Sequence, residues 1–234
     1  MGENLSFTFL INGVMNNLQK IKFLVKPTLA DKGLKIKFAI FSVSDIPRRR
    51  GSGLDKHIKD IISSLNIDGL LQSSIITEYK RLQEEAGIQE PVAPAEYLLK
   101  LIKKSRMLPN INRVVDCYNI VSAETLLSMG AHDLANIKGD LRLAITDGTE
   151  KYTPLFKIEL EKVAPNEYAA MDDEKIICRL DLKQCNETKV GENTKNFIVY
   201  VQGNKNTSDE YVMSGLKKVC DNISKFCGGE YEIL

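Results

Sequence analysis

Hydrophobic periodicity changes along this chain, and that change constrains the fold more than any other feature of the sequence. Residues 54–127 repeat apolar side chains at helical spacing, as at Leu54, Ile58 and Ile62. Residues 141–202 instead contain short segments in which apolar and polar side chains alternate, as is typical of strands. Helices and strands do not alternate regularly, so the sequence predicts an α+β fold rather than a doubly wound parallel sheet.

The same periodicity gives approximate boundaries. Helices are expected over 54–65, 75–85, from Pro94 to Pro109, from Asn112 towards Leu127 with Gly130 as its stop, and from Ser208 to Gly228. Strands are expected over 5–11, 36–40, 141–145, 156–160, 175–182 and 196–202. We divide the chain into an N-terminal α/β portion, residues 1–90, and a core, residues 91–234, within one compact unit.

The amino-acid composition limits the classes of protein to which this chain can belong. The chain has 234 residues, 43% of them hydrophobic, with 32 Lys and Arg against 31 Asp and Glu, for a net charge of +1. This is typical of a globular protein and not of a disordered one. No apolar run approaches the roughly 18 residues of a membrane span. Glu3 stands where a secretory signal has basic residues, so we expect a soluble, cytoplasmic protein.

Generic chemical motifs are absent from the sequence. The five cysteines are widely spaced with no C-x-x-C pair, and the only histidines are His57 and His132. There is no P-loop, no G-x-G-x-x-G after a strand, no G-x-S-x-G and no H-E-x-x-H. We therefore expect neither a metal ion nor a cofactor.

Two segments carry a more specific pattern. Residues 108–122 read LPNINRVVDCYNIVS, and residues 130–140 read GAHDLANIKGD. Together they resemble the editing (B3/B4) domain of the phenylalanyl-tRNA synthetase beta subunit. That family has Asn-x-Val-Val-Asp, two residues, Asn, a helix, His-Ala-Phe-Asp-Leu and then a Lys-Gly turn. The resemblance continues through 152–155, 176–179 and 194–196, and so extends over roughly Ala93 to Gly203.

The resemblance implies a three-layer sandwich of sheets and helices that removes tyrosine wrongly attached to the phenylalanine tRNA. No ATP-binding signature accompanies it, so we expect a freestanding editing module rather than a complete tRNA ligase. Its function would be hydrolysis of mischarged aminoacyl-tRNA, which protects translation fidelity. One alternative is a noncatalytic module that binds tRNA or an amino acid, and another is a hydrolase of small aminoacyl compounds.

The resemblance also implies site residues. Asn119 matches the pocket asparagine of the family, and its amide can both donate and accept hydrogen bonds. The predicted substrate contacts are Asn119, Tyr118, Gly130, Ala131 and Arg179. Two of them have structural alternatives: Asn119 can bond to the helix backbone, and Arg179 can pair with Asp181 or another acid.

The sequence departs from the family at two positions. Gly130 stands where the family has a histidine, and Tyr200 lies near the position of the family glutamate that reads the tyrosine hydroxyl. His132, two residues after the glycine, is more often a structural residue than a catalytic base. No catalytic side chain can therefore be assigned, and hydrolysis would depend on a positioned water, backbone donors and the ribose hydroxyl of the substrate.

A basic segment overlaps the predicted pocket. Between residues 95 and 114 the only acid is Glu96, whereas the basic residues are Lys100, Lys103, Lys104, Arg106 and Arg113. We predict that they contact phosphates at the 3′ end of a tRNA whose amino acid enters the pocket. The alternative is a charged helix face that is only solvated, which the net charge of +1 favours.

Overall fold

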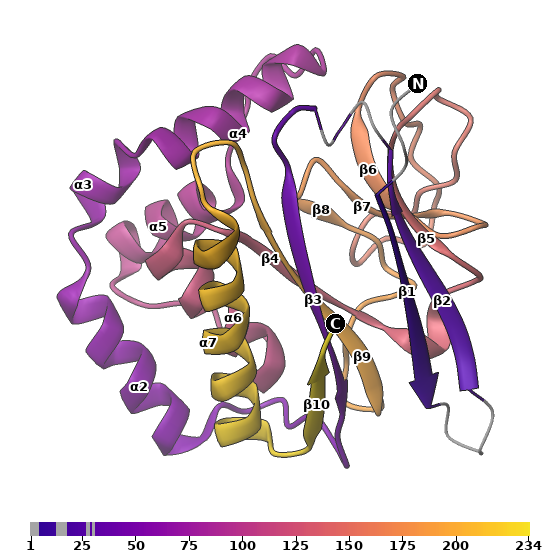
Figure 1. Cartoon of the computed structure of the whole chain (residues 1–234). Coiled ribbons are helices and arrows are strands. Elements are labelled where there is room, and N and C mark those ends of the chain that lie inside the picture. The colour runs from indigo at the N-terminus through magenta and orange to yellow at the C-terminus, as the bar shows by residue number, and fades with distance from the viewer. Residues whose placement is uncertain (1–4, 13–17, 27–28, 30) are drawn as a thin grey trace.

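The protein is built from three layers: a helical layer, a four-stranded sheet and a six-stranded sheet (Figure 1). The computed structural model describes residues 5–12, 18–26, 29 and 31–234. The four-stranded sheet lies in the middle, with the helices on one face and the larger sheet on the other. The predicted α+β class and three-layer sandwich are confirmed.

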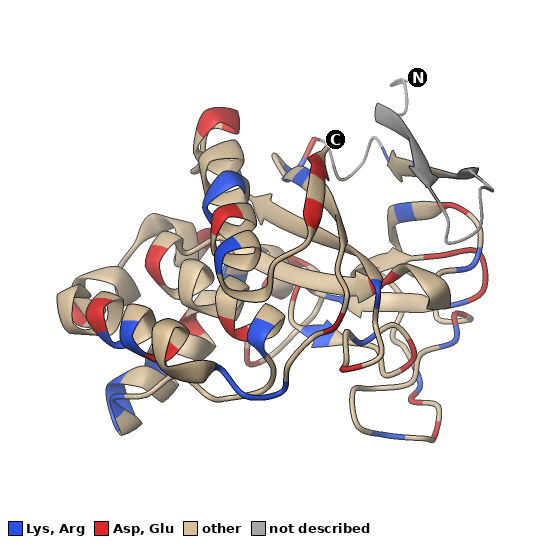
Figure 2. Cartoon of the chain, turned by 90° about the horizontal axis from the view of Figure 1, so that it is seen from below, with Lys and Arg blue, Asp and Glu red and all other residues tan. Residues whose placement is uncertain are grey.

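The helical layer is centred on α6. Its helices are α2 (Gly51–Ser64), α3 (Ile67–Leu71), α4 (Ser74–Glu85), α5 (Pro94–Ser105), α6 (Arg113–Thr125) and α7 (Asp209–Cys227). Helix α6 packs against α2, α5, α7 and strand β4. Asn112 caps α6 and Ser208 caps α7, each by accepting a backbone N–H. Acidic and basic residues are interspersed along these helices (Figure 2).

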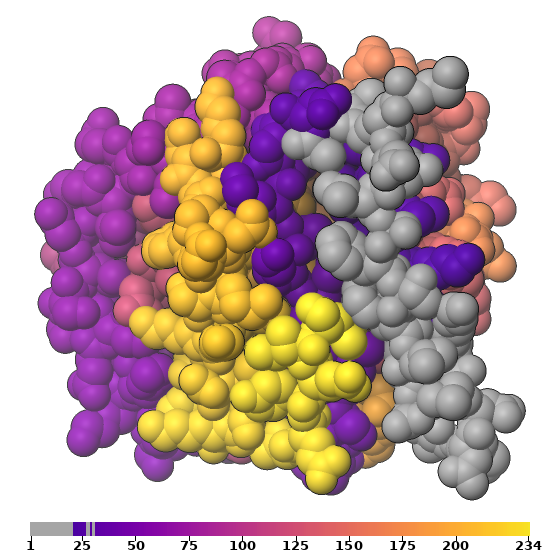
Figure 3. Space-filling view, viewed as in Figure 1, coloured from indigo at the N-terminus to yellow at the C-terminus, as the bar shows by residue number. Residues whose placement is uncertain are grey.

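The middle sheet has the order β10-β3-β9-β4 and is antiparallel throughout. Its strands are β3 (Lys35–Ser42), β4 (Ser128–Asp133), β9 (Asn196–Gly203) and β10 (Glu230–Ile233). Phe197, Val199 and Val201 of β9 pack with the helices, whereas Ile198 and Tyr200 pack with the second sheet. On the face seen in Figure 3, α7 and β10 form the surface beside β3.

The second sheet has the order β1-β2-β5-β6-β7-β8. Its strands are β1 (Leu5–Asn12), β2 (Leu18–Val25), β5 (Leu141–Ile145), β6 (Tyr168–Met171), β7 (Ile176–Arg179) and β8 (Lys183–Gln184). Strand β2 pairs with β5, and β3 pairs with β9. Both sheets therefore contain strands from residues 1–90 and strands from residues 91–234. A short 3₁₀ helix, η1 (Leu134–Asn136), follows β4.

The predicted stop of α6 at Gly130 is wrong. The helix ends at Thr125, and Leu126 follows it in the left-handed region with φ of 63°. Gly130 instead lies inside β4, where the sequence gives no alternating pattern. A glycine within a strand often marks a close approach of another group, and that is its role here.

Two predicted strands differ from the structure. The segment 156–160 alternates apolar and charged residues but forms no ladder, and Ile158 is 93% exposed. The strand predicted over 175–182 ends at Arg179, because Leu180 and Asp181 have φ of 52° and 60°. Alternation favours a strand only when a neighbouring strand is present to accept its hydrogen bonds.

The described residues contain neither a membrane-spanning helix nor a metal-binding cluster. None of the helices found there is long and apolar enough to cross a membrane. No cluster of three or more His, Cys, Asp or Glu side chains there could hold a metal ion.

We expect the middle sheet to carry much of the stability. Phe197 is fully buried and stacks on Phe41, with ring centroids 5.2 Å apart. Phe197→Ala should lower the free energy of unfolding by about 3–5 kcal/mol, because it removes a large core side chain. Phe156→Ala, at a side chain that is 75% exposed, should change it little. Urea titration of both variants tests this, and equal effects would contradict it.

Candidate substrate pocket

A pocket of about 340 Å³ opens between α5, α6, β4 and the segments that flank β8. Most of its wall is apolar, with contributions from Leu98, Val115, Met129, Leu155 and Val190. The polar side chains in its lining include Tyr118 and Asn119 of α6 and Gln184 of β8. Apolar walls with a few polar groups are typical of small-molecule sites.

A buried ion pair fixes the start of α6, which carries the predicted site. Asp116 is fully buried and accepts hydrogen bonds from Arg50 Nε at 2.7 Å and from the backbone N–H of Ile111 at 3.0 Å. The capping Asn112 also donates from Nδ2 to the carbonyl of Val190 at 3.0 Å. These contacts join α6 to the loop before it and to the far wall of the pocket.

Tyr118 and Asn119 are half-buried and reach the pocket from α6. Within the described part of the chain, neither side chain has a hydrogen-bond partner, so the predicted bond from Asn119 to the helix backbone is not formed. Burial raises the pKa of Tyr118, which keeps its hydroxyl protonated. Ser122, one turn further along, is already bonded through Oγ to the carbonyl of Leu127 at 2.7 Å.

Strand β4 separates two of the predicted contacts. Met129 and Ala131 line the pocket, whereas Gly130 does not and lies opposite Tyr200 of β9. A Cβ atom on Gly130 would lie 2.6 Å from the Tyr200 hydroxyl oxygen, which is closer than real Cβ contacts. Gly130 therefore makes room for Tyr200. The two departures from the editing-domain pattern are neighbours across β4 and β9.

His132 lies on the same side of β4 as Gly130, away from the pocket. Its Nδ1 is 2.8 Å from Thr188 Oγ1, and its ring stacks on Tyr200 at 5.8 Å. Burial lowers the pKa of His132 to about 3, so the ring is neutral at neutral pH. A neutral, enclosed imidazole in this position is a structural residue.

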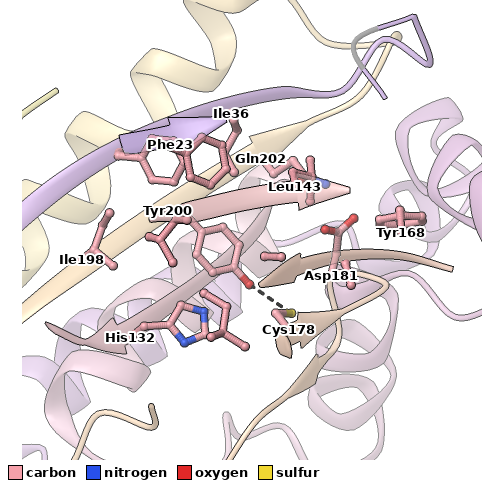
Figure 4. A pocket seen from close by; sticks show the side chains of 15 residues that line it. Phe23, Ile36, His132, Leu143, Tyr168, Cys178, Asp181, Ile198, Tyr200 and Gln202 are labelled. Carbon is pink, nitrogen blue, oxygen red and sulfur yellow. Dashed lines mark hydrogen bonds between the residues drawn. The ribbon is translucent and has the colours of Figure 1, made fainter. Parts of the chain in front are cut away.

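A small cavity of about 20 Å³ lies between the two sheets, beside His132 (Figure 4). It is lined by Tyr168, Asp181, Tyr200 and Gln202, among others. In Figure 4 the Asp181 carboxyl lies between Gln202 and Tyr168. Burial raises the pKa of this carboxyl to about 7. Asp181 also contributes to the wall of the larger pocket, so it stands between the two spaces.

Arg179 does not reach the pocket. Its guanidinium donates two hydrogen bonds of 2.7 Å to Glu167 and one of 2.9 Å to Glu161, and it lies over the ring of Tyr152. The side chain is 4% exposed. The predicted alternative of a structural ion pair is therefore what the structure contains, with Glu167 rather than Asp181 as the main partner.

Three of the five side chains in the predicted basic face are already paired within the protein. Lys100 pairs with Glu96, Lys103 pairs with Asp68, and Arg113 donates to two backbone carbonyls. Lys104 and Arg106 are exposed and form no ion pair within the described residues. Lys104 lies three residues after Leu101, which lines the pocket, so both belong to the same side of α5.

The rim of the pocket carries residues that the sequence did not single out. Tyr97 of α5 is 51% exposed and Phe156 is 75% exposed, and both line the opening. Lys189 also lines it, with its ammonium nitrogen 5.8 Å from the Phe156 ring centre. Tyr97 belongs to a predicted helix and Phe156 to a predicted strand, but neither pattern indicates that the two residues meet, so only the tertiary structure brings them together.

Comparison with known families decides the relationship. The sequence model of the B3/4 domain matches residues 86–228, which is more than half of the chain. The chain belongs to the B3/4 domain family. A search of curated proteins found no match.

One solved structure similar to this B3/4 domain is an N-terminal fragment of the phenylalanyl-tRNA synthetase beta subunit from Pyrococcus horikoshii. The TM-score is 0.48 and the sequence identity is 16%. The match covers 89% of this chain and 49% of that chain, so this B3/4 domain spans about half the length of that fragment.

The packing of Gly130 against Tyr200 predicts a mutational effect. Gly130→Ala should destabilise this B3/4 domain by about 1–3 kcal/mol, as is usual for overpacking. Gly191→Ala is the control, because a Cβ there meets nothing within 4 Å. In a Tyr200→Leu background the cost of Gly130→Ala should be smaller. Chemical denaturation of the four variants measures this, and additive effects would refute the proposed packing.

The raised pKa of Asp181 predicts that the stability of the folded protein depends on pH. Its pKa is about 7 in the folded protein and about 3.9 when unfolded, so its contribution to stability is lost as pH rises from about 4 to 7. Asp181→Asn removes this loss. The stability of the variant relative to the wild type should therefore rise by about 1.4 kcal/mol per pH unit in that window.

The comparison must be between variant and wild type at each pH. His132 acts in the opposite direction, because its lowered pKa makes stability fall as pH decreases below about 6.5. Its contribution is common to both proteins and cancels in the difference. Urea unfolding at pH 5, 6, 7 and 8 gives the result, and parallel curves would exclude a raised Asp181 pKa.

Proposed function

We propose that this B3/4 domain is an aminoacyl-tRNA deacylase that hydrolyses mischarged tRNA in trans. The observation that carries the proposal is the Asn119 amide, which has no partner among the described residues and faces an apolar pocket of about 340 Å³. That volume is in the lower part of the range for small-molecule sites, about 300–1,000 Å³. An amino acid side chain would occupy the apolar part, with its ester near Asn119.

The reaction is the hydrolysis of an ester. Water adds to the carbonyl carbon, and the bond to the ribose oxygen breaks, giving a free amino acid and a tRNA with its terminal hydroxyl restored. The Asn119 N–H group would donate to the carbonyl oxygen, where negative charge develops in the transition state. This assigns Asn119 the role of a substrate contact rather than a base.

The attacking water needs another source of activation. No histidine lines the pocket, and the one carboxylate in its wall, Asp181, has its carboxyl between Tyr168 and Gln202. We therefore assign proton transfer to the adjacent hydroxyl of the substrate's own ribose, which is held beside the ester. Such a site does not require a metal ion or a cofactor.

The rim fits the end of a tRNA. Exposed Tyr97 and Phe156 offer faces on which a base can stack, and Lys189 offers a charge for a phosphate. Lys104, exposed on the side of α5 that carries Leu101, would offer a second charge nearby. With a net charge of +1, affinity for the rest of the tRNA would be low and sensitive to salt. We propose a cytoplasmic location, because charged tRNAs are used there in translation.

A second candidate is a noncatalytic module that binds an amino acid or the tRNA end. It is favoured by the lack of any imidazole among the pocket residues and by the inward position of the Asp181 carboxyl. Thermal stabilisation by a ligand, without turnover, would distinguish it from the deacylase.

A deacylation assay over a panel of correctly and incorrectly charged tRNAs tests the proposal. One mischarged species should be hydrolysed selectively, and Asn119→Ala should lower kcat/KM for it by about 10²–10³-fold, as for loss of an oxyanion donor. Asn193→Ala makes the same substitution at an exposed loop residue and should leave the rate unchanged. If every charged tRNA stays intact, the deacylase proposal is rejected.

A further inference from the structure

Gln184 is a pocket residue whose side-chain amide is held in one orientation. Its Nε2 donates to the hydroxyl oxygen of Tyr200 at 2.8 Å. The Tyr200 hydroxyl in turn donates to Cys178 Sγ at 3.6 Å, the dashed line of Figure 4. Because the hydroxyl proton is directed at sulfur, the oxygen can only accept from Gln184, and this places the NH₂ group on the Tyr200 side.

The backbone of Gln184 is also fixed. Its carbonyl accepts the N–H of Leu155 at 3.0 Å and the hydroxyl of Tyr152 at 3.2 Å. Its neighbour Lys183 pairs with Arg179 in the short β7–β8 ladder. The backbone carbonyl and Nε2 of Gln184 are thus both hydrogen-bonded, whereas Oε1 has no partner among the described residues. The side chain of Gln184 lines the pocket.

Gly130 is required for this arrangement. A Cβ at that position would lie 2.6 Å from the Tyr200 oxygen and 2.8 Å from Gln184 Nε2. The absence of a side chain therefore creates the space in which the two residues meet. Both sequence departures from the editing-domain pattern contribute to one feature, the orientation of Gln184.

A free carbonyl oxygen in an apolar wall selects for a hydrogen-bond donor. Asn119 supplies a second amide in the same pocket that has no hydrogen-bond partner in the described part of the chain. Lys189 also lines the pocket, and its ammonium group donates to Asn186 Oδ1 at 2.8 Å. A bound carboxylate would find no donor at Oε1, whereas an ammonium group has three donors to offer and no acceptor.

We propose that Gln184, oriented by Tyr200, accepts a hydrogen bond from the α-ammonium group of the bound aminoacyl ligand. The pocket then selects amino acid esters with a free amino group over the corresponding deaminated or N-acylated esters. This inference rests on the proposed function, in that it takes the ligand to be an aminoacyl group. Tyr200 is a positioning residue, and Gln184 determines specificity.

Binding of stable analogues tests the inference without turnover. The probes are 3′-amino-3′-deoxyadenosines acylated with L-leucine, L-phenylalanine or L-methionine, each paired with the analogue that lacks the amino group. Isothermal titration should show the wild type preferring the amino form by about 10-fold or more, the value of one charged hydrogen bond. Gln184→Met should abolish that preference, so that the amino and deaminated forms bind about equally.

Two further variants separate positioning from folding. Tyr200→Phe keeps the ring but frees the Gln184 amide to rotate, so the preference should fall to an intermediate value. Gln72→Met is the matched control, because the same substitution is made at an exposed residue, and its preference should equal that of the wild type.

The outcomes distinguish the two proposals. If the probes bind but amino and deaminated forms bind equally, or if Gln184→Met keeps the preference, the role of Gln184 is overturned while the aminoacyl pocket stands. If no probe binds and no charged tRNA is hydrolysed, the proposed function fails, and this inference fails with it.

Discussion

Strand β9 is covered on both faces, and the arrangement of the molecule depends on that constraint. Its odd-numbered residues Phe197, Val199 and Val201 join the core beneath the helices, and Ile198 and Tyr200 join the core between the sheets. A strand in this position must place every side chain in a packed environment. Tyr200 is accommodated only because its neighbour across the ladder, Gly130, has no side chain.

The titratable groups that a hydrolytic site would use lie between the sheets instead. His132 and Asp181 both line the small inter-sheet cavity, and burial favours the neutral form of each. The polar groups of the pocket are mainly amides and hydroxyls in an apolar wall, with Lys189 also in the lining and Asp181 between the two spaces. Amides and hydroxyls can bind and orient an ester but have little capacity to move protons, and for this reason the proposed hydrolysis relies on the ribose hydroxyl of the substrate. This division also explains why one proposal depends on the amide of Asn119 and the other on the amide of Gln184.

Local signals predicted most of the helical layer and one part of the site. The apolar stripes of α6 and α7, with Ser208 as the cap of α7, placed those helices within a few residues. The motif around Asn119 lies in the wall of the candidate pocket. The prediction failed where structure depends on a partner: residues 156–160 have a strand pattern without a neighbouring strand. Gln184 was missed because a strand of two residues has no recognisable period.

The sequence by itself determined which residues are neighbours on a helix or alternate along a strand, since both follow from backbone geometry. It therefore settled the α+β class and put Tyr118 and Asn119 together on α6. Only the tertiary structure decided that Ala131 faces the pocket while Gly130 faces Tyr200, and that Arg179 pairs with Glu167 rather than reaching a ligand. Alternation specifies that adjacent residues point to opposite faces, but which layer covers each face depends on packing between segments distant in sequence.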